Sequence, residues 1–213
     1  MSFPSRLLFH PTVDCPRVED IVVDGDLSDW AGISPLPPLC ALDGQQPFAE
    51  VRIAWSTKGL YVAISTERDE PVAVSRQRPH SADSLQLWID TRGSTSGRRA
   101  TRFCHHFILL PSGGGPSRRE PIGWQERIRR ALDQGSMAGP DDLVVAARHD
   151  GQVYTLEALL PAEALHGFEP EAGQLIGFTY LITDLVRGRQ TYACGDAFPY
   201  PHNPETWSRL RLA

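Results

Sequence analysis

The chain of 213 residues is 41% hydrophobic and 22% charged, an ordinary balance for a globular protein with one core. Its formal net charge of −5 makes nucleic acid and anionic membranes unexpected partners, because both carry negative charge themselves. No part of the sequence approaches the about 20 apolar residues of a membrane-spanning helix.

Residues 1–19 contain three prolines and little periodicity, so we expect an extended arm or an edge segment ahead of a single domain at 20–213. One arginine and a short apolar run broken by proline are too little for a secretion signal. The sequence as it stands therefore predicts a cytoplasmic protein. An extracellular or periplasmic location would apply if the chain has been trimmed.

Short β-branched and aromatic runs separated by turn residues follow through the first half. Asp24-Gly25 is a strong turn signal, and Lys58-Gly59 is expected to join two strands as a hairpin. One run alternates, with Leu85, Leu87 and Ile89 on one face and Gln86, Trp88 and Asp90 on the other. The strands predicted here are Ile21–Asp24, Val51–Trp55, Leu60–Thr66, Val72–Ser75, Ser84–Thr91 and Arg102–Pro111.

The second half continues the pattern after a glycine-rich connection at 112–116, which we expect to be flexible. Trp124–Gln134 has both helical and strand spacing, and its strand-rich flanks favour a strand. Asp150-Gly151 predicts a second hairpin, and Pro161–Leu165 predicts a single helical turn. The remaining strands are predicted at Leu143–Arg148, Val153–Leu160, Leu175–Asp184, Gln190–Cys194 and Thr206–Leu212.

This order of elements predicts an all-β protein: an antiparallel β-sandwich of the immunoglobulin-like or jelly-roll type, with long loops and one short helical turn. Three segments carry a resemblance: Ile21–Trp30 (IVVDGDLSDW), the 51–64 hairpin and Asp83–Asp90 (DSLQLWID). In this order they resemble the opening of the family 9 carbohydrate-binding modules. Tyr154–Pro161 and Ile176–Asp184 are similar to later parts of that family, so the resemblance spans residues 20–213.

The resemblance implies a non-catalytic domain that binds a glycan or oligosaccharide by aromatic stacking. The family is similar to the wider DOMON-like superfamily, which contains both sugar binders and b-type haem binders, so the fold leaves the ligand open. Trp30 and Trp207 are expected in the core, whereas Trp55 fits either role. The candidate ligand-binding residues are Trp124, Trp88, Phe198, Tyr200, His202 and Asn203.

Acidic residues also gather at the first turn, where Asp24, Asp26 and Asp29 could bind a structural calcium ion. No EF-hand pattern accompanies them, and a solvated turn explains them as well. No other cofactor is expected with certainty. His105 and His106 should point to opposite sides of a strand, so they cannot both bind one metal ion; either could bind haem together with a methionine or another histidine.

The sequence contains no hydrolase, metalloprotease or nucleotide-binding motif. Glu157 and Asp184 could pair as glycosidase carboxylates, but a structural role for Glu157 is favoured, and we expect no enzyme. An intracellular protein-interaction scaffold is the alternative function, and a haem- or metal-binding module is a third. The arginines at 118, 119, 127, 129 and 130 could form a solvated face or meet an acidic sugar.

Four cysteines occur, at Cys15, Cys40, Cys104 and Cys194, and none is in a Cys-x-x-Cys pair. Their number allows two disulfides, although Cys104 lies in an apolar run that favours a buried thiol. The sequence predicts no oligomeric state.

Overall fold

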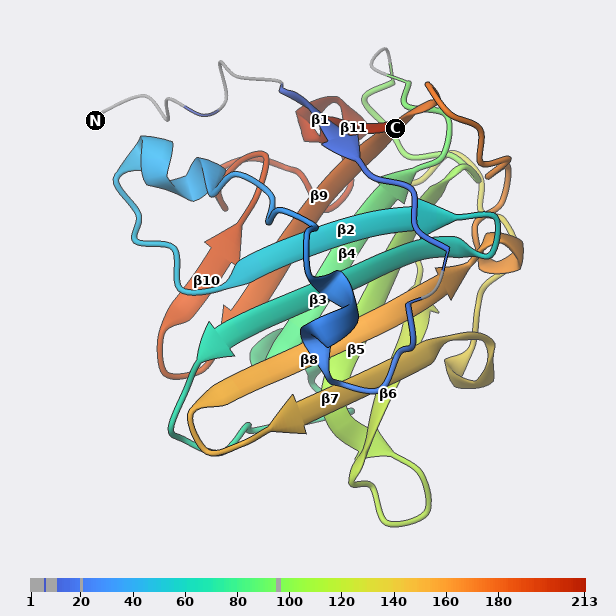
Figure 1. Ribbon diagram of the computed structural model, residues 1–213. Coiled ribbons are helices and arrows are strands. Elements are labelled where there is room, and N and C mark those ends of the chain that lie inside the picture. Colours follow the sequence, from blue (N-terminus) through green and yellow to red (C-terminus); the bar gives the residue numbers. More distant parts are fainter. Residues whose placement is uncertain (1–5, 7–10, 20, 95–96) are drawn as a thin grey trace.

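A computed structural model places the chain in two β-sheets packed face to face, with loops and short turns between the strands (Figure 1). The structure describes residues 6, 11–19, 21–94 and 97–213, so residues 1–5 and 7–10 of the predicted arm lie outside the described residues. No helix among the described residues has the length and apolar character needed to cross a membrane.

The larger sheet has seven strands in the order β1-β11-β9-β4-β5-β6, and β10 also pairs with β9. Their bounds are β1 Thr12–Cys15, β4 Ser84–Asp90, β5 Cys104–Gly114, β6 Glu120–Glu126, β9 Leu175–Asp184, β10 Gly188–Thr191 and β11 Ser208–Leu212. All pairs are antiparallel except β1 with β11, which is parallel. The predicted antiparallel β-sandwich is confirmed, and its one parallel pair among the described strands adds β1, from the segment predicted as an arm, to the edge of the larger sheet.

The smaller sheet has four antiparallel strands in the order β2-β3-β8-β7. Its strands are β2 Glu50–Ser56, β3 Gly59–Glu67, β7 Val144–His149 and β8 Val153–Pro161. Both predicted hairpins are confirmed here. The Lys58-Gly59 turn works because Gly59 has φ 147°, and a Cβ there would lie 2.1 Å from the carbonyl oxygen of Leu160.

The core lies between the sheets and is built by alternation along the strands. Leu85, Leu87 and Ile89 of β4 face it, together with Phe107 and Leu109 of β5. Each fully buried side chain of this size contributes roughly 1.5–3 kcal/mol to folding. Because side chains alternate, Gln86 and Trp88 lie on the opposite, outer face of the larger sheet, as the sequence predicts.

Two of the predicted strands are not strands in the structure. Ile21–Asp24 is extended but not a strand: the backbone N–H groups of Asp24 and Gly25 donate to a carboxylate oxygen of Glu157 instead of to another strand. Val72–Ser75 is also irregular, since the N–H of its second residue donates to Asp83. In both places a side chain takes the backbone donor that a neighbouring strand would need.

Other boundaries differ in detail. The connection predicted at 112–116 is partly strand, because β5 continues through a bulge between Leu110 and Gly114. The strand predicted from Trp124 ends at Glu126. Six single 3₁₀ turns occur among the described residues where one helical turn was predicted: η2 Leu27–Trp30, η3 Leu39–Asp43, η4 Pro79–Ser81, η5 Pro140–Asp142, η6 Ala162–Ala164 and η7 Pro204–Thr206.

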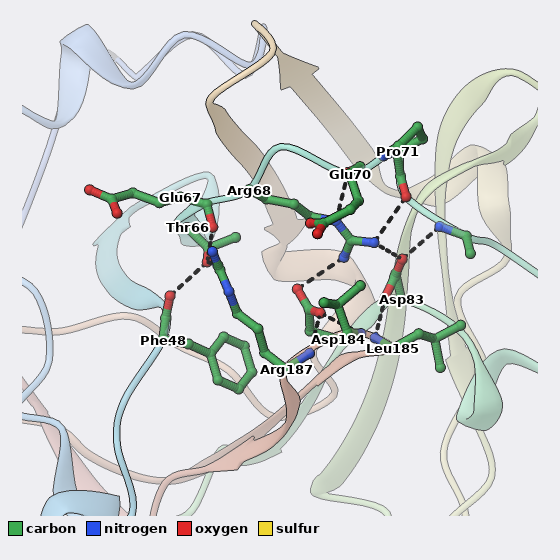
Figure 2. Close-up of polar contacts among 12 residues, drawn as sticks. Phe48, Thr66, Glu67, Arg68, Glu70, Pro71, Asp83, Asp184, Leu185 and Arg187 are labelled. Atoms are coloured by element: carbon green, nitrogen blue, oxygen red, sulfur yellow. Dashed lines mark hydrogen bonds and ion pairs between the residues drawn. The ribbon is translucent and has the colours of Figure 1, made fainter.

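A buried ion cluster joins the loop after β3 to β4 and β9 (Figure 2). The guanidinium of Arg68 lies 2.9 Å from the carboxylates of both Asp83 and Asp184, and its N–H groups also donate to the carbonyls of Glu70 and Pro71. Backbone N–H groups satisfy the carboxylates further, from Ala73, Leu185, Val186 and Arg187. Asp184 is thus a structural residue.

All four cysteines are free thiols. Three are buried and Cys104 is partly buried, which fits the prediction of a thiol at that position.

Candidate functional site

The outer face of the larger sheet carries a row of polar and aromatic side chains. Trp88 of β4 is opposite His106 of β5, and His106 is opposite Glu126 of β6. Gln86 lies two residues before Trp88 and points to the same side. Neighbouring strands hold opposite residues about 5 Å apart, so the register alone brings these side chains together.

The rings in this row are stacked. Trp88 and His106 lie nearly parallel, with ring centroids 4.3 Å apart and planes at 7°. Tyr200, from the loop before β11, meets Trp88 edge-on at 5.3 Å, and His80 from η4 lies beyond His106 at 6.2 Å. Such contacts fix the orientation of each ring.

A cavity of about 360 Å³ lies over this row. Its walls come from β4, β5, β9, β10, the segment after β6 and the loop before β11. The lining residues are His80, Gln86, Trp88, His106, Glu126, Arg127, Ile128, Arg129, Leu181, Arg189, Tyr200, Pro201 and His202.

Gln86 is the polar centre of the cavity floor. Its amide oxygen lies 3.1 Å from Nε2 of His106 and 3.2 Å from Nδ1 of His80. Nε2 of His80 lies 3.2 Å from a carboxylate oxygen of Glu126. Burial, reinforced by the nearby His80, lowers the pKa of His106 to about 3, so its ring is neutral near pH 7.

Two buried N–H donors at this floor have no hydrogen-bond partner within the part of the chain that the structure describes. They are Nε2 of Gln86 and Nε1 of Trp88, and each side chain is only 2% exposed. Leaving a buried donor unpaired costs roughly 1–3 kcal/mol. Two such donors lining one cavity are therefore suited to a ligand that presents hydroxyl or other acceptor oxygens.

The loop before β11 is held against the cavity by polar contacts. Arg189 of β10 forms an ion pair with Asp196 at 2.7 Å and donates to the hydroxyl of Tyr200 at 3.2 Å. The Tyr200 hydroxyl donates to Asp196, and the indole N–H of Trp207 donates to the Tyr200 carbonyl at 2.8 Å. The backbone is thus fixed just before His202 at the rim.

Three of the six predicted ligand-binding residues line the cavity: Trp88, Tyr200 and His202. Phe198 is half-buried and packs against the cluster that contains Trp88. Asn203 accepts the N–H of Glu205 at the start of η7 and borders an adjoining hollow.

Trp124 lies on the same sheet face but does not line the cavity. It is half-buried and packs against the apolar cluster of Ile108, Leu110 and Ile122. Trp30 and Trp207 are buried as predicted, and Trp55 is buried as well.

The sequence patterns did not identify five of the cavity residues: Gln86, His80, His106, Glu126 and Arg189. A signal existed for Gln86, since its spacing places it on the same face as Trp88. For His106, Glu126 and Arg189 the required information is the strand register, which for example joins Trp88 and His106, about 20 positions apart. For His80 it is the path of the turn η4 over the sheet.

The acidic turn lies on the other side of the molecule, over the smaller sheet. Asp24 and Asp26 accept backbone N–H groups within the turn, and Asp29 accepts that of Val22. Asp26 also meets Arg148 at 3.2 Å. Among the described residues no three His, Cys, Asp or Glu side chains gather in a metal-binding group. Calcium binding at this turn stays a prediction.

Glu157 lies beneath the same turn and is fully buried. It accepts the indole N–H of Trp30 at 2.9 Å as well as the two backbone donors of Asp24 and Gly25. The structural role predicted for Glu157 is confirmed, and its carboxylate and that of Asp184 are each bound into a different network.

No known protein family and no curated protein matches the sequence. The fold, however, is similar to that of a family 9 carbohydrate-binding module from Caldicellulosiruptor kristjanssonii. In its glucose complex the TM-score is 0.66 at 15% identity, covering 95% of both chains. In its cellotriose complex the TM-score is 0.64 at 16% identity, covering 95% of this chain and 93% of that one.

A protein from Bacteroides uniformis that has been proposed to bind carbohydrate is also similar, with a TM-score of 0.63 and 11% identity over 95% of this chain and 99% of that one. The fold of this chain is thus that of the family 9 carbohydrate-binding modules, and the predicted β-sandwich is confirmed. Membership of the DOMON-like superfamily stays a prediction.

Proposed function

We propose that the protein is a non-catalytic carbohydrate-binding domain, and that the cavity over Trp88 is its binding site. The observation that carries this proposal is the pair of unpartnered N–H donors, from Gln86 and Trp88, at the floor of an aromatic-lined cavity. Sugar hydroxyls provide the acceptors that these donors lack, and ring faces provide apolar contact.

The similar fold supports the same reading, since the structures it resembles hold glucose and cellotriose. The absence of catalysis belongs to the proposal as well. Glu157 and Asp184 hold structural donors, so neither carboxylate is free to act on a glycosidic bond.

In this proposal Trp88 contributes mainly its indole N–H, because one ring face is covered by His106 and its edge meets Tyr200. His202 and Tyr200 form the wall that a sugar ring would contact. Trp124 would extend the site only if a longer ligand crosses Ile108, its partner on β5.

The test is binding of the purified chain to a glycan array, followed by calorimetry with the best ligand. We expect Trp88→Phe and His202→Ala each to weaken binding about tenfold or more, since each removes a ligand contact. Trp30→Phe on the opposite sheet is the matched control and should leave binding intact. Trp124→Phe measures whether the site extends across β5.

Binding to no glycan, or binding that survives both cavity variants, would refute this assignment. The first result would favour the alternative of a protein-interaction scaffold. A Soret band in the purified protein would instead favour the haem alternative.

A further inference from the structure

Positive charge gathers at the cavity rim although the chain as a whole carries −5. Arg127, Arg129 and Arg189 line the cavity, and His202 borders both it and an adjoining hollow of about 410 Å³. That hollow has three further arginines: Arg98, Arg99 and Arg130. Against these six arginines the two hollows have one lining carboxylate, that of Glu126.

Most of this charge is not neutralised by neighbours. Arg189 is paired with Asp196, and Arg98 lies 3.6 Å from Glu205. Arg99 donates to the backbone carbonyls of Arg130 and Ala131, which leaves its charge uncompensated.

The side chains of Arg127, Arg129 and Arg130 form no ion pair or hydrogen bond with any residue that the structure describes, and all three are exposed. Three unpaired arginines within four residues are the feature from which the ligand chemistry can be inferred.

The backbone after β6 presents these arginines to the cavity. Ile128 is 5% exposed and packs into the cluster that contains Trp88 and Tyr200, so its neighbours Arg127 and Arg129 remain at the surface. Arg130 has φ 62°, a left-handed conformation that residues other than glycine rarely adopt. The Nε of Arg99 donates to the Arg130 carbonyl at 2.8 Å and holds this bend.

We propose that the ligand is an acidic carbohydrate, whose anionic groups bind Arg127, Arg129 and Arg130 while a sugar ring occupies the cavity over Trp88. This inference rests on the proposed function and adds the substrate class. A guanidinium binds a carboxylate or a sulfate ester through two parallel N–H donors, so uronate and sulfated sugars share the required chemistry. The cavity and the adjoining hollow share His202 in their walls, so together they would accommodate successive sugar residues of one oligosaccharide.

The experiment is calorimetric titration of the full chain with tetrasaccharides in matched charged and neutral forms. Tetragalacturonate and hyaluronan tetrasaccharide provide the carboxylates, and carboxyl-reduced forms provide their neutral counterparts. A heparan sulfate tetrasaccharide and its desulfated, N-acetylated form, which keeps the uronate carboxylates and lacks only the sulfates, provide the sulfate arm, and carboxyl reduction of the desulfated form provides its neutral counterpart. We expect at least one charged form to bind about tenfold or more tighter than its neutral form at low salt, and the preference to shrink in 0.5 M NaCl because salt screens exposed charges.

Two double variants assign the effect. Arg127→Gln with Arg129→Gln should remove most of the preference for the charged form, measured as the ratio of its affinity to that of the neutral form. Arg148→Gln with Arg211→Gln removes the same charge from exposed positions that do not line the cavity, and should keep the preference.

Equal binding of charged and neutral forms, or a preference that survives loss of Arg127 and Arg129, would overturn this inference while leaving a carbohydrate-binding domain in place. Failure of every charged and neutral sugar to bind would overturn the proposed function itself. A 12-mer of deoxythymidine that binds as tightly as the best sugar, and depends on the same arginines, would assign the rim to nucleic acid instead.

Discussion

Trp30 and Trp88 lie on opposite outer faces of the sandwich, and their surroundings differ in one respect. Each is 2% exposed. The indole N–H of Trp30 donates to Glu157, whereas that of Trp88 has no partner among the described residues. Two tryptophans with the same degree of burial therefore differ in whether their polar atom is satisfied from within the chain.

The difference follows from what covers each face. The segment that carries Ile21 and Trp30 lies over the smaller sheet, where Figure 1 shows it in blue, and packs on Ala54, Tyr61 and Ala63. Over Trp88 the larger sheet is covered by the segment after β6 and the loop before β11, and these two segments also line the cavity. For these two tryptophans, the indole N–H is satisfied on the structural face and has no partner among the described residues on the candidate binding face.

The largest expected effect is the loss of Glu157. Glu157→Ala leaves three donors without their acceptor in a buried site and should lower the free energy of unfolding by about 3–5 kcal/mol. Urea unfolding followed by tryptophan fluorescence measures it. Glu163→Ala, at an exposed position of η6, is the control and should change stability little. A loss below about 1 kcal/mol at Glu157 would show that the covered face does not depend on this carboxylate.

The second effect is a pH dependence of stability that comes from two buried histidines of the larger sheet, His105 and His106. Burial is the main cause that lowers the pKa of His105 to about 4 and that of His106 to about 3. Both rings are neutral in the folded chain, whereas the unfolded chain takes up their protons below about pH 6.5. The unfolded state then binds more protons, so stability should fall as the pH is lowered from about 6.5 to about 4.

The loss should be on the order of 2 kcal/mol for each histidine by pH 4.5. Urea unfolding at pH 7.0, 5.5 and 4.5 measures it. His106→Gln should flatten the decline, because glutamine takes up no proton. An unchanged slope in this variant would place the pH dependence elsewhere.

The third effect compares the two tryptophans directly. Trp30→Phe removes a hydrogen bond to a charged acceptor and should destabilise the chain by about 1.5–3 kcal/mol more than Trp88→Phe, since both lose similar packing. Thermal and urea unfolding of the two variants give the difference. Equal destabilisation would mean that the N–H of Trp88 is satisfied in solution by something other than a ligand.

The smallest effect concerns the surface above the acidic turn. Arg148→Gln breaks an exposed ion pair with Asp26 and should cost less than about 1 kcal/mol. A larger loss, measured by the same urea unfolding, would indicate that the turn depends on this pair and not mainly on Glu157.

The sequence correctly predicts strands whose backbone donors and acceptors pair with neighbouring strands, as their alternating or apolar pattern suggests. Leu175–Asp184 has the predicted bounds, because turns confine it and its apolar residues repeat regularly. Ile21–Asp24 also has the composition of a strand, but its donors are taken by Glu157, which is more than 130 residues away. No local pattern contains that contact.

The candidate site shows the same limit. Residue type and position in the sequence predict Trp88 and Tyr200 as ligand-binding residues, and both line the cavity. The same criteria predict Trp124, which packs against an apolar cluster instead. Gln86 and His106 become cavity residues only through the register between β4 and β5. Sequence patterns indicate which face a residue occupies, while the register decides which side chains on that face meet.

The four free cysteines have a practical consequence. Burial raises the pKa of each thiol, to about 12 at Cys104 and about 11 at Cys194, so hardly any thiolate is present near neutral pH. Alkylating dyes react with the thiolate, so the native chain should resist labelling. An Ala197→Cys substitution, at an exposed position beside Phe198, would then accept a fluorophore at a single site and report on occupancy of the nearby hollow by its emission.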